Sequence, residues 1–157
     1  MEIPELCYVS EANIVFSISG NIRRPREFSA TDLAQLSRTK LTVDDKKCGS
    51  ITYEGVWLRT IFEQAEVPQG KKLKGEKLAF FLLIEALDGH QIVYALAEFD
   101  SDFGNRNPLL ADYRDGQPLR EDEAPLRLII PGERRHSRWI RKIAHMKVLS
   151  GLPDQSR

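Results

Sequence analysis

The sequence contains no apolar run long enough to cross a membrane and no excess of charge of either sign. A membrane-spanning helix needs about 18 or more consecutive apolar residues, and no run in the 157-residue chain approaches that length. The 23 basic residues balance the 23 acidic ones, so long-range attraction to nucleic acid or an anionic membrane is not expected. We therefore expect neither membrane insertion nor a nucleic-acid partner.

Cysteine is scarce, and the motifs of common catalytic classes are missing. Cys7 and Cys48 fit one disulfide or two unrelated thiols equally well. Neither lies in a Cys-x-x-Cys or histidine-rich stretch, which argues against structural zinc. His90, His136 and His145 lack ligand spacing. Nucleophile-elbow, Walker and dinucleotide-binding glycine motifs are also absent from the sequence. The sequence therefore nominates no catalytic residue.

Short alternating apolar runs dominate the chain and predict strands. The expected strands cover residues 13–20, 40–44, 51–53, 78–86, 92–94, 109–111, 126–130 and 143–148. Helical patterns are fewer. One begins at Ser29 or Thr31, which are suitable N-cap residues, and one follows Gly55 and stops before Pro68. We expect one α+β domain over residues 1–157, with short helices on a β core.

Three further expectations concern particular positions. Residues 78–86 (LAFFLLIEA) are almost all apolar, as in a strand covered on both faces. Trp57 is expected in the core, on the helix after Gly55. The acidic run Glu121, Asp122 and Glu123 is expected to be solvated in a turn.

Residues 131–142 form a basic loop between two of the expected strands. After a Pro-Gly turn, this loop carries Arg134, Arg135, His136, Arg138, Trp139, Arg141 and Lys142. Guanidinium groups bind oxyanions and stack on aromatic rings, so we take Arg134, Arg135, His136 and Arg138 as candidate anion- or cofactor-binding residues. Trp139 is placed to anchor the loop through cation–π contact. A solvated basic loop explains the same residues, and the pattern leaves both interpretations open.

The order of these pieces resembles the molybdopterin-binding domain of sulfite-oxidase-type oxidoreductases over about residues 13–149. The residues that carry the resemblance are Gly20, Pro25, Phe28 and Asp32-Leu33; Tyr53-Glu54-Gly55-Val56-Trp57-Leu58; Asp88-Gly89; Leu110-Ala111; Gly116-Gln117-Pro118-Leu119; Ala124-Pro125-Leu126-Arg127-Leu128 with Pro131-Gly132; and Arg138-Trp139-Ile140. No one motif is diagnostic, but seven in the same order make chance similarity improbable. The resemblance implies a β-rich α+β fold of the same type.

The resemblance also implies a molybdenum cofactor, and here the sequence departs from the family. Members bind molybdenum through the pterin dithiolene and one protein cysteine, which the family pattern puts near Val43 to Asp45; Cys48 comes three to five residues later. The loop after Gly132 is shorter than usual, and residues 1–157 contain no match to the His/Arg segment that clasps the pterin. A large, multiply charged ligand loses much of its binding energy without these groups.

Two functions of different class follow. The favoured one is a cofactor-free or degenerate binding module of this fold for a small anion or a partner protein. The alternative is a molybdenum-pterin oxidoreductase domain that transfers oxygen atoms or electrons. In that alternative Cys48 is the metal ligand, and Arg134, Arg135, His136 and Arg138 hold the cofactor phosphate. The first residues show no signal peptide, yet similar short proteins are often exported, so we expect a periplasmic location and allow for a redox partner.

Overall fold

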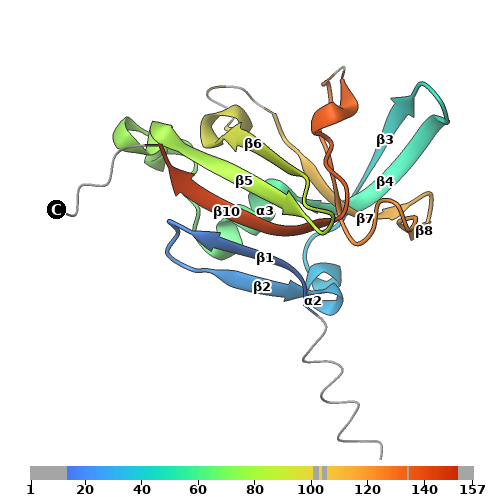
Figure 1. The fold of residues 1–157 in the computed structure, drawn as a ribbon, viewed down its shortest axis with the longest axis horizontal. Helices are drawn as coiled ribbons and strands as arrows, with labels where there is room; N and C mark the ends of the chain where they lie inside the picture. Colours follow the sequence, from blue (N-terminus) through green and yellow to red (C-terminus); the bar gives the residue numbers. More distant parts are fainter. Residues whose placement is uncertain (1–13, 101–102, 104–105, 134, 152–157) are drawn as a thin grey trace, which may run out of the picture.

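The computed structural model describes residues 14–100, 103, 106–133 and 135–151, whose strands form two sheets (Figure 1). The first sheet has the strand order β2-β1-β10-β5-β6. Its strands are β1 (Ile14–Gly20), β2 (Arg26–Ser29), β5 (Phe80–Ala86), β6 (Gln91–Ala95) and β10 (Ile143–Ser150). Strands β1 and β10 run parallel, and the other neighbouring pairs are antiparallel.

The second sheet is antiparallel and is built around a hairpin. Its order is β3-β4-β7-β8, with β9 pairing with β7. The strands are β3 (Thr39–Asp45), β4 (Gly49–Trp57), β7 (Leu109–Arg114), β8 (Gln117–Pro118) and β9 (Arg127–Ile129). The turn between β3 and β4 spans residues 46–48, so Cys48 lies beyond the end of β3, as expected from the sequence.

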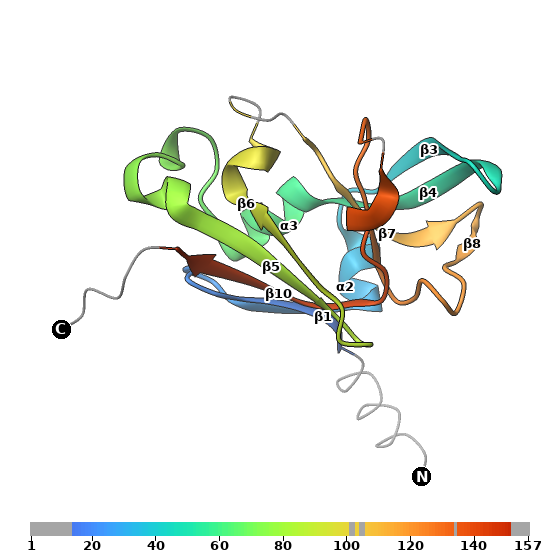
Figure 2. The same ribbon diagram turned by 45° about the horizontal axis from the view of Figure 1, so that its top comes forward.

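The helices are short and lie around the sheets. They are α2 (Ala30–Gln35), α3 (Leu58–Ala65) and the 3-10 helices η1 (Gly70–Lys72), η2 (Gly75–Ala79), η3 (Leu96–Phe99) and η4 (His136–Arg138). Figure 2 shows α3 on one side of the first sheet, in continuation of β4. None of the helices in the described part of the chain is long and apolar enough to cross a membrane. The expected β-rich α+β fold is confirmed.

The local sequence explains those helices and strands that bury one face in the core. In β1, Phe16 and Ile18 are buried while Ser17 between them is partly exposed. Helix α2 begins as expected at Ser29, whose hydroxyl accepts the N–H of Asp32 at 3.1 Å while the Asp32 carboxylate accepts the N–H of Ser29 at 2.9 Å. This reciprocal capping satisfies two backbone donors that a helix start leaves free.

Several expected boundaries differ from those of the structure, and two of the differences affect how the elements are packed. Strand β5 begins at Phe80 rather than at residue 78, and its residues alternate between buried and partly exposed. Because only alternate side chains of β5 are fully buried, the core covers this strand on one face and not on both. The helix expected directly after Gly55 begins only at Leu58. Val56 and Trp57 belong to β4, because their backbones pair with β7.

At Gly55 the backbones of β4 and β7 lie too close for a side chain. A Cβ atom there would overlap the carbonyl oxygen of Leu110 and lie 2.7 Å from the Cα atom of Ala111. No other residue fits without separating the two backbones. Gly55 thus allows β4 to pack closely against β7.

The basic loop stands beside the β3–β4 hairpin in both views of the ribbon (Figures 1 and 2). These segments lie about ninety positions apart in the sequence, yet they line one hollow together. Strands β9 and β10 hold the two ends of the loop. The fold therefore brings Cys48 and the basic loop to the same end of the molecule.

Candidate functional site

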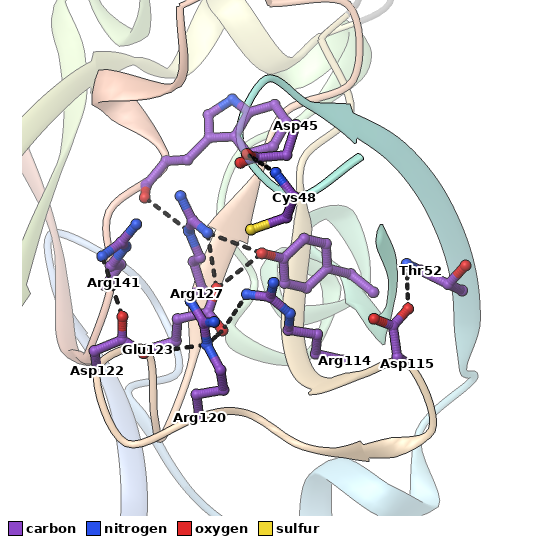
Figure 3. A network of polar contacts seen from close by, with 12 residues as sticks. Asp45, Cys48, Thr52, Arg114, Asp115, Arg120, Asp122, Glu123, Arg127 and Arg141 are labelled. Atoms are coloured by element: carbon purple, nitrogen blue, oxygen red, sulfur yellow. Dashed lines mark hydrogen bonds and ion pairs between the residues drawn. The ribbon is translucent and has the colours of Figure 1, made fainter. Parts of the chain in front are cut away.

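The turn that carries Cys48 is closed by the carboxylate of Asp45. This carboxylate accepts the backbone N–H of Lys47 at 2.7 Å and of Cys48 at 3.0 Å, and the two hydrogen bonds lower the pKa of Asp45. Cys48 is a free, exposed thiol, and its sulfur points toward the side of the hairpin where Arg114 lies (Figure 3). The other cysteine, Cys7, lies outside the described residues.

A buried carboxylate lies beneath this turn. Glu123 is completely buried and accepts hydrogen bonds from the Tyr53 hydroxyl at 2.8 Å, from Nη1 of Arg127 at 2.8 Å and from Nη1 of Arg114 at 3.1 Å (Figure 3). Burial alone would raise the pKa of Glu123, but these three donors outweigh it and lower the pKa. Glu123 is thus held as a carboxylate that ties β4, β7 and β9 together.

This arrangement corrects the expectation that the acidic run is solvated. Glu121 and Asp122 are exposed, but Glu123 is not. Position 123 lies four residues before Arg127, and the turn folds its side chain inward onto that guanidinium. A carboxylate that meets two guanidinium groups and a phenol can be buried, whereas an unpaired one cannot.

Trp139 connects this network to the basic loop. Its carbonyl accepts a hydrogen bond from Nε of Arg127 at 3.2 Å, and the Arg127 guanidinium lies 5.8 Å from the indole centroid. His136 stacks on the same indole, with ring centroids 3.6 Å apart and an interplanar angle of 11°. Trp139 therefore anchors the loop as expected, but its cation–π contact is with Arg127 of β9 and not with the arginines beside it. Its ring N–H is buried and has no partner in the described residues.

Two small hollows flank the His136–Trp139 stack. The first measures about 250 Å³ and is lined by Arg127, Arg141, His90, His136, Ser137 and Trp139, together with Asp88. The second measures about 240 Å³ and lies between residues 41–44 of β3 and residues 131–133 of the basic loop, again with His136 and Trp139. The stacked rings form the wall between the two hollows. Each hollow is smaller than the roughly 300–1,000 Å³ typical of sites for drug-sized ligands.

The structure separates the candidate residues of the basic loop. His136 lines both hollows, whereas Arg138 does not. The Arg138 guanidinium binds Glu133 at 2.7 Å and Glu98 at 3.3 Å, and it lies 4.3 Å from the ring centroid of Tyr94. Arg135 is exposed. The fourth candidate, Arg134, lies outside the described residues.

These contacts bear on whether the chain fits a molybdopterin. Three guanidinium groups at this end, those of Arg114, Arg127 and Arg138, are bound by carboxylates of the protein itself. The neighbouring hollows are too small to enclose a large polyanion. Among the described residues at this end, these three guanidinium groups therefore already have protein partners, and neither hollow is large enough to enclose a pterin.

Comparisons with known proteins agree on the fold. The model of the oxidoreductase molybdopterin binding domain family matches residues 2–151. The crystal structure of the sulfane dehydrogenase SoxCD from Paracoccus pantotrophus superimposes with a TM-score of 0.64 at 20% sequence identity, covering 85% of this chain and 37% of that one. The chain thus spans little more than a third of the SoxCD chain that it matches. A search of curated proteins gave no match.

Proposed function

The chain belongs to the oxidoreductase molybdopterin-binding domain family, and we propose that it is a cofactor-free module of this fold that binds a small oxyanion beside His136. The observation that carries the proposal is the hollow of about 250 Å³ where Arg127, Arg141 and two histidines converge. Its size suits a tetrahedral oxyanion such as sulfate or phosphate better than a pterin.

The donors in this hollow differ in how strongly they are held. Arg127 is fixed because its Nε and Nη1 atoms bind Trp139 and Glu123, which orients the rest of its guanidinium. Arg141 has an ion pair with Asp122 at 3.5 Å, in which both side chains are about half exposed. Such exposed pairs contribute only about 0–1 kcal/mol. Arg141 is therefore free to exchange Asp122 for a bound anion, while Arg127 provides a preformed wall.

Ligand-dependent thermal stability tests the proposal. A specific site occupied at 100 times its dissociation constant adds about 2.7 kcal/mol to the free energy of unfolding. We expect sulfate or phosphate to raise the melting temperature of the wild type above that given by the same ionic strength of chloride. The double variant His136→Asn/Arg141→Gln should lose this rise.

A control double variant removes the same two residue types from positions outside the hollow. The variant Arg24→Gln/His145→Asn also removes one arginine and one histidine, both exposed, and neither residue lines the hollow. It should retain the full rise in melting temperature. Equal rises in the two double variants would show that the anion acts elsewhere or only through ionic strength, and the proposal would fail.

The alternative is a molybdenum-pterin oxidoreductase domain. The position of Cys48 favours it, because its exposed thiol lies at the end of the molecule where Arg114 and the basic loop also lie (Figure 3). Protein made in a host that produces the cofactor separates the two functions. We expect no stoichiometric molybdenum by elemental analysis. Near-stoichiometric molybdenum that Cys48→Ser abolishes would replace the cofactor-free proposal with this one.

We further propose that the protein acts outside the cytoplasm and beside a redox partner. This proposal rests on the family resemblance described above, because similar short proteins are often exported. Fractionation of cells that express the native gene, followed by cross-linking in the periplasm, tests both parts. Recovery in the cytoplasmic fraction alone would contradict the proposed location.

A further inference from the structure

A large hollow lies at the other end of the molecule from Cys48. It measures about 860 Å³ and lies where the segment after β1, the C-terminus of α3, the two helices η1 and η2 and the start of β5 meet. The nine residues of β4 and the eight of α3 separate this large hollow from the β3–β4 turn. It shares no lining residue with the hollows beside His136.

Apolar side chains line one part of the large hollow. Phe62 and Val67 are buried, at 2% and 5% exposure, and Ile22, Pro68 and Phe80 are partly buried beside them. Ligand sites typically have this composition, with an apolar lining and a few polar groups that fix orientation. The large hollow is therefore suited to the body of an organic molecule, which a bare oxyanion would leave unfilled.

Unpaired cations line another part. Arg23, Lys72 and Lys77 are exposed, and none of them forms a salt bridge within the described residues. Residues 21–24 and 63–77 together carry six basic and three acidic side chains, whereas the whole chain is formally neutral. This end of the molecule is thus locally positive, and its cations have no protein partner to give up before they bind an anion.

Two acidic side chains also line the large hollow, and their position indicates which part of the hollow is positive. Glu63 and Glu66 lie on the α3 side of the large hollow. The backbone N–H groups of Arg24, Glu66 and Val67 occupy the carbonyl oxygens at the end of α3, at 2.9–3.3 Å. The helix end therefore offers no free acceptors, and the charge that faces a ligand is set by the side chains. An anionic group is favoured at Lys72 and Lys77, away from the two glutamates.

We propose that the large hollow binds an organic anion with an apolar body, such as an alkyl or aryl carboxylate or sulfonate. The apolar body packs on Phe62, Val67 and Phe80, and the anionic group lies between Lys72 and Lys77. The size of the hollow, about 860 Å³, falls within the range of small-molecule sites. This site is independent of the oxyanion hollow beside His136, so either proposal can fail without the other.

Three probes distinguish the contribution of the anionic group from that of the apolar body. Decanoate, below its micelle concentration, has both the anion and the apolar body; acetate lacks the body, and decyltrimethylammonium reverses the charge. Titration calorimetry on the full chain should show saturable binding of decanoate near one equivalent, with much weaker heats for the other two. Amide chemical-shift changes should fall within residues 21–23 and 62–80. Binding of the cationic probe as tight as that of decanoate, or shift changes outside these segments, would overturn the proposal.

Charge variants supply matched controls. Lys72→Gln/Lys77→Gln should weaken decanoate binding by about three- to tenfold, since each exposed ion pair contributes a fraction of a kcal/mol up to about one. Glu63→Gln/Glu66→Gln should strengthen it. Lys46→Gln/Lys47→Gln removes the same charge from the exposed β3–β4 turn and should change nothing. Equal weakening by the two lysine pairs would mean that only net charge matters, and the assigned site would be wrong.

Discussion

The two ends of the molecule use basic residues in opposite ways. At the hairpin end, the guanidinium groups of Arg114 and Arg127 bind the buried Glu123, and that of Arg138 binds Glu133. At the end of α3, Lys72 and Lys77 have no salt bridge within the described residues. The hairpin end carries the basic loop, yet these three guanidinium groups are neutralised by carboxylates of the protein. What a basic cluster can bind thus depends on its partners more than on its charge count.

The largest effect on this contrast is expected from removing Glu123, the carboxylate that neutralises Arg114 and Arg127 at the hairpin end. Glu123→Ala leaves Arg127 buried and without its main partner, which costs about 3–5 kcal/mol in typical buried pairs. We expect chemical denaturation to show a loss of this size. Glu121→Ala, two positions away and exposed, should change the free energy of unfolding by no more than about 0.5 kcal/mol.

A double variant keeps this prediction testable if Glu123→Ala does not fold. Glu123→Gln/Arg127→Met removes both charges at similar volume, and such replacements are often close to neutral. It should recover most of the stability lost by Glu123→Ala. If the double variant is as unstable as the single one, the network stabilises the fold through its geometry and not by compensating charge, and the contrast between the two ends loses its electrostatic basis.

Low pH tests the same contrast between the two ends, because it protonates Glu123 without a mutation. The pKa of Glu123 in the folded protein lies below its ordinary value of 4.5. Its carboxylate therefore adds stability that is present above pH 4.5 and is lost as the pH falls through the folded-state pKa. The difference in unfolding free energy between wild type and Glu123→Gln should shrink in that window and stay constant from pH 5 to 7. A difference that is unchanged by acid would assign the stabilising role to another group.

Much of the fold could be predicted from the sequence. Strand β1 and the start of α2 follow from local rules, since Phe16 and Ile18 alternate with polar residues and Ser29 with Asp32 forms a capping box. Prediction failed where a distant strand decides the outcome. Trp57 looks helical beside Leu58, but β7 pairs with it and extends β4. Sequence periodicity describes one segment at a time, so it cannot reveal that a distant strand pairs with that segment.

The site was less accessible to sequence reasoning. The sequence favours Arg138 as an anion-binding candidate but gives no sign of its contacts with Glu133, Glu98 and Tyr94. It likewise predicts a solvated Glu123, because the two acidic residues before it are exposed. The signal that could have found it is its spacing of four residues from Arg127 in a stretch that enters β9. A carboxylate and a guanidinium that both approach a buried strand are expected to pair.

The smallest expected effect compares one cation from each end directly. Arg138→Met removes the 2.7 Å contact with Glu133, whose side chain is only 11% exposed. Arg106 still binds the same oxygen at 3.2 Å, but the other carboxylate oxygen of Glu133 is buried and unpartnered within the described residues, so the variant leaves a poorly solvated carboxylate with one partner fewer. Because hydrogen bonds to charged groups contribute about 1.5–3 kcal/mol and this arginine is partly exposed, we expect a loss of about 1–2 kcal/mol. Lys72→Met removes an exposed cation with no salt bridge and should cost less than about 0.5 kcal/mol. Denaturant midpoints at an unchanged slope measure both losses. Equal losses would mean that pairing does not distinguish the two ends, and that the lysines beside the large hollow hold the fold as the arginines do.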